Sequence, residues 1–306
     1  MTEAEILDRL RSRIRLPRSS TLIAGIGDDC AIYRSPHSTE DLLLTTDFLI
    51  EGVHFLTSTH KAADIGHKVL ARGLSDIAAM GGVPRFCLLS LAIPASVNSK
   101  WIDAFYGGLL TLAEAHSTVL AGGDLSRSEN IACDIVCGGA VKRGRAILRS
   151  TARPGDAIYV SGRLGGSAVG LETGRGSGLR RHLRPEPRLE LGRYLQRLHA
   201  TAAMDLSDGL SIDLDRMCTA SATSAELETV PVFRGATLEQ ALNGGEDYEL
   251  LFTTPPRVRV PTVFGDIPLT RIGTMHEGSG KRTSKDPRVS LNGEPVPVLG
   301  HDHFRP

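Results

Sequence analysis

Aspartates recur beside glycine or hydroxyl residues at the ends of short apolar segments of this sequence. The instances are Gly25-Ile26-Gly27-Asp28-Asp29, Thr45-Thr46-Asp47, Leu74-Ser75-Asp76, Gly122-Gly123-Asp124 and Asp205-Leu206-Ser207-Asp208-Gly209. Each one alone is typical of a turn or a helix cap, because Asp, Ser and Gly favour both. Together, the five indicate carboxylates that several strands and helices bring into one site.

Gathered carboxylates repel one another unless cations lie between them. These segments offer hard oxygen ligands without a matching set of His or Cys, and this combination favours Mg²⁺ that is shared with substrate phosphates. The neighbouring glycines allow phosphate oxygens to approach backbone N–H groups, and Arg149 supplies a further cation. The sequence therefore predicts a site with several magnesium ions that acts on a phosphorylated substrate.

Other common nucleotide and hydrolase motifs are incomplete. Gly278-Ser279-Gly280-Lys281 resembles the end of a P-loop, but Met275 stands where the first glycine of that motif belongs. Gly25 and Gly27 are followed by Cys30 at the third glycine position of a dinucleotide-binding loop. No G-x-S-x-G elbow of an α/β-hydrolase is found. These absences weigh against P-loop, Rossmann and serine-hydrolase chemistry.

Composition narrows the class of protein further. The 306 residues carry 35 basic and 35 acidic side chains, so no net charge attracts nucleic acid or an anionic membrane. Apolar stretches such as 88–94 are far shorter than the roughly 20 residues of a membrane span. The five cysteines are scattered and form no C-x-x-C pair, which is typical of a reduced chain. We expect a cytoplasmic protein that binds neither nucleic acid nor membrane.

Alternating strand-like and helix-like patterns must position the aspartates. Hydrophobic periodicity predicts strands at 42–48, 85–93, 131–141, 156–161, 202–206 and 248–253, helices at 64–80, after 99, at 187–198 and from 208, and a hairpin at 289–298 around Asn292-Gly293. A glycine turn is expected at 122–124, and the arginine-rich stretch 143–154 marks a domain boundary. The pattern favours two α/β domains of about 150 residues each.

Motifs along almost the whole chain resemble a known family. They are GIGDDCA at 25–31, TTD at 45–47, GVHF at 52–55, LSDIAAMGGVP at 74–84, FYGGL at 105–109, AGGD at 121–124, GRAILRSTARPGD at 144–156, HLRPEP at 182–187, MDLSDGL at 204–210, GGEDYELLFT at 244–253 and DHF at 302–304. In this order they resemble the thiamine-monophosphate kinase family of the aminoimidazole ribonucleotide synthetase-like superfamily. His301 departs from the family pattern, which has an aromatic residue there.

The resemblance implies a two-domain α/β fold with mixed sheets of the α+β type. Residues 1–148 would form an N-terminal domain that binds ATP and metal and pairs with its copy in a homodimer, and residues 149–306 a C-terminal α/β domain. The implied reaction is ATP-dependent phosphorylation of thiamine monophosphate to thiamine diphosphate with several Mg²⁺ ions. Because a phosphate acceptor with a second pKa of about 6 is already largely anionic, we expect direct in-line transfer without a catalytic base or a phosphoenzyme.

The resemblance also implies three sets of site residues. The metal ligands would be Asp29, Thr45, Thr46, Asp47, Asp76, Asp124, Asp205 and Asp208. ATP would contact Tyr106, Gly123, Asp124, Arg149 and Ser207, and thiamine monophosphate would contact His54, Glu246 and Phe304.

Two alternatives stay open. One is another ATP-using enzyme of the superfamily, against which the GVHF, HLRPEP and GGEDYEL segments weigh. The other is a nucleotide-binding protein without catalysis, which the complete set of acidic motifs makes the weaker reading.

Overall fold

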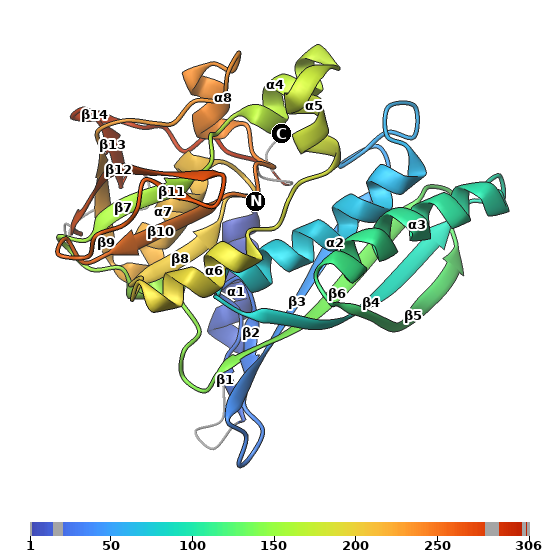
Figure 1. Ribbon diagram of the computed structural model, residues 1–306, viewed down its shortest axis with the longest axis horizontal. Helices are drawn as coiled ribbons and strands as arrows, with labels where there is room; N and C mark the ends of the chain where they lie inside the picture. Colours follow the sequence, from blue (N-terminus) through green and yellow to red (C-terminus); the bar gives the residue numbers. More distant parts are fainter. Residues whose placement is uncertain (1, 15–20, 279–287, 302–303, 305–306) are drawn as a thin grey trace.

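Two β-sheets and the helices that cover them build the protein (Figure 1). The structure is a computed structural model that describes residues 2–14, 21–278, 288–301 and 304. The P-loop-like stretch at 279–281 and the residues Asp302 and His303 of the DHF motif lie outside the described residues. Among the helices that are described, none combines the length and the apolar content that a membrane span requires.

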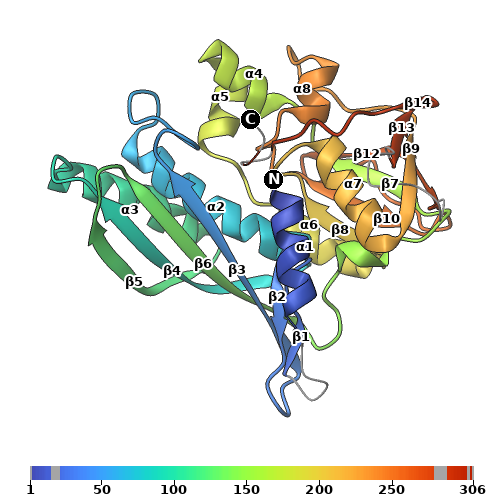
Figure 2. The same cartoon turned by 180° about the vertical axis from the view of Figure 1, so that it is seen from behind.

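The N-terminal half forms a six-stranded mixed sheet with strand order β1-β2-β3-β6-β4-β5, in which β4 and β5 are parallel. Its elements are α1 (Glu3–Arg13), β1 (Leu22–Ala24), β2 (Ala31–Tyr33), β3 (Glu40–Ile50), α2 (Ala62–Ala79), β4 (Val83–Ile93), α3 (Ser99–Ala115), β5 (Val119–Arg127) and β6 (Ala132–Lys142). Helices α2 and α3 cover one face of the sheet, and Figure 2 shows the other face without a helix over it.

The alternation of side chains along β3 decides what faces α2. Leu43 and Leu49 are fully buried on the helix side, whereas Phe48 is 48% exposed on the other side. Because side chains of a strand alternate between the two faces, Thr45 and Asp47 share the face of Leu43 and point towards α2. Helix α2 is buried on nearly all sides, so the polar residues on it lie inside the protein.

The C-terminal half forms an eight-stranded sheet with the order β14-β13-β9-β12-β7-β10-β8, and β11 pairs with β12. Its elements are the short 3-10 helix η1 (Arg149–Thr151), β7 (Ala157–Ser161), α4 (Gly166–Thr173), α5 (Gly176–Leu183), α6 (Leu189–Arg197), β8 (Ala202–Asp205), α7 (Leu210–Ser221), β9 (Thr223–Leu227), α8 (Leu238–Asn243), β10 (Leu250–Thr254), β11 (Val263–Phe264), β12 (Ile267–Glu277), β13 (Val289–Leu291) and β14 (Glu294–Pro295).

Helix α6 joins the two halves by packing on α2. Leu191 and Leu195 of α6 belong to the same buried core as the N-terminal sheet. The two helices touch closely, since a Cβ atom at Gly192 would lie 2.0 Å from the carbonyl oxygen of Ala78. The C-terminal end of α2 is therefore enclosed between the two halves, next to the end of β8.

The structure confirms the α/β class, the two-part organisation and most predicted elements, including the hairpin at Asn292-Gly293. The glycine turn expected at 122–124 is wrong, because β5 runs through these residues beside β4. Glycine is required there for close approach: a Cβ atom at Gly123 would lie 1.8 Å from the carbonyl oxygen of Leu89. The elements that were not predicted are helices α1, α5 and α8 and strands β1, β2, β9, β11 and β12.

Candidate metal and phosphate site

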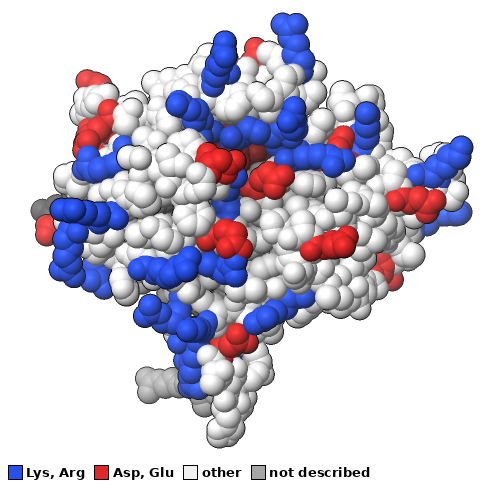
Figure 3. Space-filling view, in the orientation of Figure 1, with Lys and Arg blue, Asp and Glu red and all other residues white. Residues whose placement is uncertain are grey.

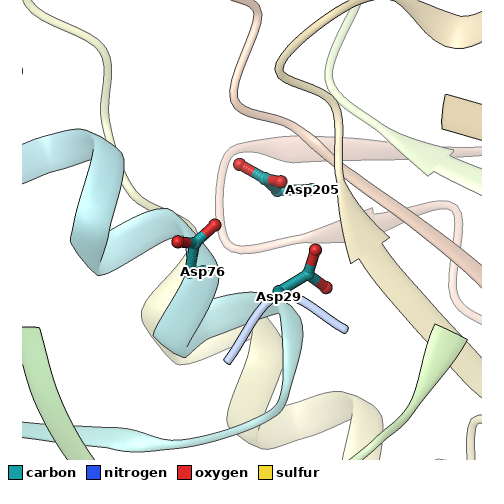
Figure 4. Close-up of side chains that lie close together, drawn as sticks. All are labelled: Asp29, Asp76 and Asp205. Carbon is teal, nitrogen blue, oxygen red and sulfur yellow. The ribbon is translucent and has the colours of Figure 1, made fainter. Parts of the chain in front are cut away.

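Three aspartates meet where the two halves join. Asp29 precedes β2, Asp76 lies near the end of α2, and Asp205 ends β8 (Figure 4). One carboxylate oxygen of each lies within 4.8 Å of the others. Residues that are far apart in the sequence thus place three negative groups around one point.

Hydroxyl groups fix two of these carboxylates. The Oγ1 of Thr45 donates a hydrogen bond of 2.5 Å to Asp76, and the Oγ of Ser75 donates one of 2.6 Å to Asp205. Asp29 instead forms an ion pair with the Nη2 of Arg149. Two of the three carboxylates therefore have no cation of their own among the described residues.

The pKa values of the clustered carboxyl groups are raised, as expected where buried negative charge is in excess. Burial raises the pKa of Asp76 and of Asp205 well above the ordinary value, and the other nearby carboxylates raise each pKa further. Burial also raises the pKa of Asp29, although Arg149 acts against it. Asp28, behind Asp29, has its pKa raised to about 7 by burial and by Asp29. A cation placed among these groups would favour their ionised forms.

Two buried polar atoms of the Asp29–Arg149 pair lack a hydrogen bond within the described residues. The Oδ2 of Asp29 and the Nε of Arg149 are buried and have no hydrogen-bond partner among the described residues. Buried polar atoms are almost always paired, so each of these atoms calls for a ligand. Carboxylate and hydroxyl oxygens are the donors that Mg²⁺ prefers, so the residues present fit a divalent metal.

Two more aspartates flank the cluster, each held by an arginine. Arg72 grips both oxygens of Asp47, with Nε–Oδ2 at 2.9 Å and Nη2–Oδ1 at 2.5 Å. Arg216 lies 2.5 Å from Asp208, in the turn between β8 and α7. The backbone N–H of Asp208 is in turn bound by the carboxylate of Asp213, which is fully buried. Acidic side chains also gather near the middle of the face in Figure 3, with Lys and Arg around them.

The GGEDYEL loop brings a further carboxylate to the border of the site. Glu246 has a left-handed backbone with φ of 53°, and its N–H donates to the carbonyl of Ser207 at 2.6 Å. Its two carboxylate oxygens contact the Nζ of Lys68 at 2.8 Å and the Nδ1 of His182 at 3.1 Å. Burial would raise the pKa of Glu246, but these two partners more than offset it and hold the pKa well below its ordinary value.

The other two acids of this loop have structural partners. Asp247 accepts backbone N–H groups at the start of α4, and Glu249 is fully buried in contact with Arg181 and Arg188. Of the three acids, Glu246 is the one whose carboxylate contacts a side chain of α2 among the described residues.

Comparison with known proteins agrees with this geometry. Residues 27–141 match the AIR synthase related protein, N-terminal domain, and residues 153–285 match the corresponding C-terminal domain. The thiamine-monophosphate kinase of Haemophilus influenzae is 38% identical over 92% of this chain and 91% of its own length. That of Bacillus subtilis is 34% identical, covering 94% of this chain and 95% of its own length. The chain belongs to the thiamine-monophosphate kinase family.

A solved structure supports the same family at the level of the fold. A protein described as AaThiL complexed with AMPPCP and TMP superimposes with a TM-score of 0.86 and is 32% identical. The match covers 99% of this chain and 97% of that chain. Membership of the thiamine-monophosphate kinase family, expected from the motifs, is thereby confirmed.

Most residues expected from the thiamine-monophosphate kinase motifs lie around the cluster. One chain brings together the carboxylates of Asp29, Asp76 and Asp205, with Thr45 and Arg149 bonded to them. Asp47, Ser207, Asp208 and Glu246 border it. Phe304 is 52% exposed, and the chain before it reaches the site because the N–H of His301 donates to the carbonyl of Asp208.

Other expected residues stand apart from the cluster within one chain. Thr46 lies on the face of the sheet opposite Asp47 and bonds Asp134, and the register places Asp124 on that same open face, with Gly123 beside it in β5. Tyr106 packs level with the first part of α2, about three helical turns from Asp76. His54 accepts the N–H of Ile50 in the turn after β3.

Sequence reasoning missed the cations of α2. Lys68, Arg72 and Asp76 follow one another at intervals of four, which puts them on one face of the helix. The signal was present, since charged residues at this spacing inside an otherwise apolar helix indicate a polar stripe. Their partners could not be read from it, because Glu246 is 178 residues away along the chain from Lys68.

Proposed function

We propose that this protein transfers the γ-phosphoryl group of ATP to thiamine monophosphate, forming thiamine diphosphate. The observation that carries the proposal is the meeting of three carboxylates beside the Glu246 loop, two of which have no cation among the described residues. A carboxylate cluster that can hold a divalent metal suits a reaction between two phosphorylated substrates. Support comes from relatives that are named thiamine-monophosphate kinase and from the similar structure that contains AMPPCP and TMP.

The residue roles follow from position. We assign Mg²⁺ binding to Asp29, Thr45, Asp47, Asp76, Asp205 and Asp208, with Thr46 and Asp124 as more distant candidates. ATP contacts are assigned to Arg149 and Ser207, together with Tyr106, Gly123 and Asp124. Thiamine monophosphate contacts are assigned to His54, Glu246 and Phe304.

The reaction needs positioning and charge neutralisation more than proton transfer. Bound magnesium would screen the repulsion between the two phosphorylated substrates and stabilise the charge of the transition state. The three carboxylates would hold the metal, and the hydroxyl groups of Thr45 and Ser75 orient those of Asp76 and Asp205. Arg149 carries positive charge to the same point, and its Nε, which forms no hydrogen bond within the described residues and lies 3.7 Å from Asp28, could bind a phosphate oxygen. Direct in-line transfer follows, with no general base required.

We further propose a homodimer built on the open face of the N-terminal sheet. Phe48 is 48% and Leu88 37% exposed on this face, and an uncovered apolar sheet face is typical of an interface. Gly123 and Asp124 lie on β5, apart from the cluster, so a second chain could complete the ATP site. Sedimentation equilibrium should give twice the chain mass of 32.8 kDa; a monomer at micromolar concentration would contradict the proposal.

Two organisational proposals accompany the function. We place the boundary between an N-terminal ATP-binding, metal-binding and dimerisation domain and a C-terminal domain at 148/149, where η1 begins after the end of β6. We also propose a cytoplasmic location, since all five cysteines are unpaired and buried.

Purified protein with ATP, Mg²⁺ and thiamine monophosphate is expected to form thiamine diphosphate, measured by chromatography. Unphosphorylated thiamine is the control acceptor and should give no product, because it lacks the anionic phosphate that attacks. Absence of product from folded protein that still binds Mg-ATP would move the assignment to a different acceptor within the superfamily. Absence of ATP turnover with any acceptor would favour a non-catalytic nucleotide-binding protein.

A further inference from the structure

Arg72 forms an ion pair with Asp47, a carboxylate that the proposed reaction requires as a metal ligand. Its Nε and Nη2 lie 2.9 Å and 2.5 Å from the two oxygens of Asp47. The side chains of Arg72 and Asp47 are only 14% and 19% exposed, so little water competes with this bidentate pair. A metal ion at Asp47 would therefore meet a fixed positive charge already in its place.

The position of Arg72 on α2 puts it between two parts of the site. Asp76 of the carboxylate cluster lies four residues after it, and Lys68, the partner of Glu246, lies four residues before it. Burial disfavours the charged guanidinium, but the carboxylates of Asp47 and Glu246 favour it, and the pKa of Arg72 lies well above its ordinary value. The guanidinium thus stays charged between the carboxylate cluster and the Glu246 loop.

We propose that Arg72 is a displaceable counter-ion of Asp47, which releases this carboxylate when a divalent cation binds and then binds a phosphate oxygen of a substrate. The first part follows from charge: a guanidinium and a divalent cation on the same carboxylate repel each other strongly at short distance. The second part, the phosphate contact, rests on the proposed function.

A released Arg72 needs a new anion because it is largely buried. The carboxylate of Glu246 is the neighbouring acid on the other side, but its two oxygens are already paired with Lys68 and His182. Asp76 and Asp205 belong to the metal cluster. A phosphate group that arrives with the substrate offers two oxygens that the planar guanidinium can bind in a bidentate way. The ion pair between Arg72 and Asp47 would thus separate, with the metal ion bound to Asp47 and the phosphate bound to Arg72.

The proposed exchange predicts opposite changes in the affinity for metal and the affinity for phosphate when Arg72 is replaced. Arg72→Leu removes the competitor, so Mn²⁺ should bind more tightly without substrate, on the order of tenfold. The same variant loses a phosphate contact, so with saturating Mn²⁺ a phosphorylated ligand should bind more weakly, also on the order of tenfold. A residue with only a structural role would not move the two affinities in opposite directions.

The experiment is a Mn²⁺ titration of full-length protein, with free Mn²⁺ followed by electron paramagnetic resonance. Calorimetric titrations at saturating Mn²⁺ then use AMPPCP and thiamine monophosphate as separate ligands, and the ligand whose affinity falls identifies the phosphate that Arg72 contacts. Arg34→Leu is the matched control, since Arg34 grips Asp41 in the same bidentate way, at 2.6 and 2.8 Å, remote from the cluster. The control should leave all three affinities unchanged.

Unchanged or weaker Mn²⁺ binding in Arg72→Leu would overturn the displacement, and unchanged binding of both ligands would overturn the phosphate contact. An equal change in Arg34→Leu would overturn the site-specific reading. If the leucine variant fails to fold, Arg72→Gln keeps a hydrogen bond to Asp47 without the charge, and the same outcomes apply. If Arg72→Leu binds Mn²⁺ more tightly but the wild-type protein does not phosphorylate thiamine monophosphate, the proposed function is wrong and the displacement at Asp47 still holds.

Discussion

Asp76→Asn is expected to reduce kcat by on the order of a hundredfold to a thousandfold, while it makes the metal-free protein more stable. The loss of rate follows from the position of Asp76 in the cluster with Asp29 and Asp205. An amide is a weaker and neutral metal ligand, so the metal that would stabilise the transferring phosphoryl group loses charge and position. The measurement is steady-state formation of thiamine diphosphate at saturating Mg²⁺.

The gain in stability follows from the raised pKa of Asp76, which burial and the carboxylates of Asp205 and Asp29 cause. Above the unfolded pKa the unfolded chain releases this proton more readily than the folded chain. Folding stability therefore falls as pH rises from the unfolded pKa of 3.8 towards the raised folded pKa. Each unit of that interval costs about 1.4 kcal/mol, and Asn, which cannot ionise, avoids the cost.

Thermal unfolding with a chelator tests this effect. Asp76→Asn should unfold several degrees higher than the wild type at about pH 8, with a smaller gain at about pH 5, since roughly 2–4 °C corresponds to 1 kcal/mol in a chain of this size. Asp103→Asn is the control, because Asp103 is exposed on α3 and should change neither rate nor stability. A variant that keeps near-normal kcat would remove Asp76 from the metal set, and a lower unfolding temperature would contradict the charge repulsion.

The elements with a clear hydrophobic periodicity could be predicted from the sequence. The apolar pattern at 42–48 predicted most of β3, and the apolar spacing at 64–80 predicted α2. The failure at 122–124 has a physical cause, because glycine there serves the close approach of β5 to Leu89 and a glycine pair reads locally as a turn. Helix α1 was missed although a capping box of Thr2 and Glu5 marks its start.

The site could be predicted as a set of residues but not as a network of partners. Asp29, Asp76 and Asp205 are recognisable from their local motifs, and the structure brings them together. Which cation pairs with which carboxylate depends on contacts between distant segments, such as Arg149 with Asp29. Local patterns carry no information on such pairs. That is why the partners of Lys68 and Arg72 could be identified only from the structure.

Lys68→Met is expected to destabilise the protein by about 3–5 kcal/mol. Lys68 is fully buried, and its Nζ lies 2.8 Å from Glu246. Removing one member of a buried ion pair leaves the other as an uncompensated charge, and this cost exceeds the worth of the pair itself. Chemical denaturation in urea gives the free energy of unfolding directly.

A double-mutant cycle separates the pair from the packing around it. Glu246→Gln should also destabilise the protein, but adding it to Lys68→Met should cost less than the sum of the two, because no unpaired charge then remains. The control is Lys100→Met, since Lys100 is exposed at the start of α3. Additive losses in the cycle would show that Lys68 and Glu246 do not act as a pair.

The ion pair between Lys68 and Glu246 also decides which substitution can test the role of Glu246 in binding the acceptor substrate. Glu246→Ala would leave the ammonium of Lys68 buried without its partner, so its kinetic effect would mix substrate contact with loss of structure. Glu246→Gln keeps the shape and a hydrogen-bond acceptor, and it is expected to raise the KM for thiamine monophosphate on the order of tenfold while the KM for ATP stays constant. A parallel rise in both KM values would assign Glu246 to the architecture of the site and remove it from acceptor recognition.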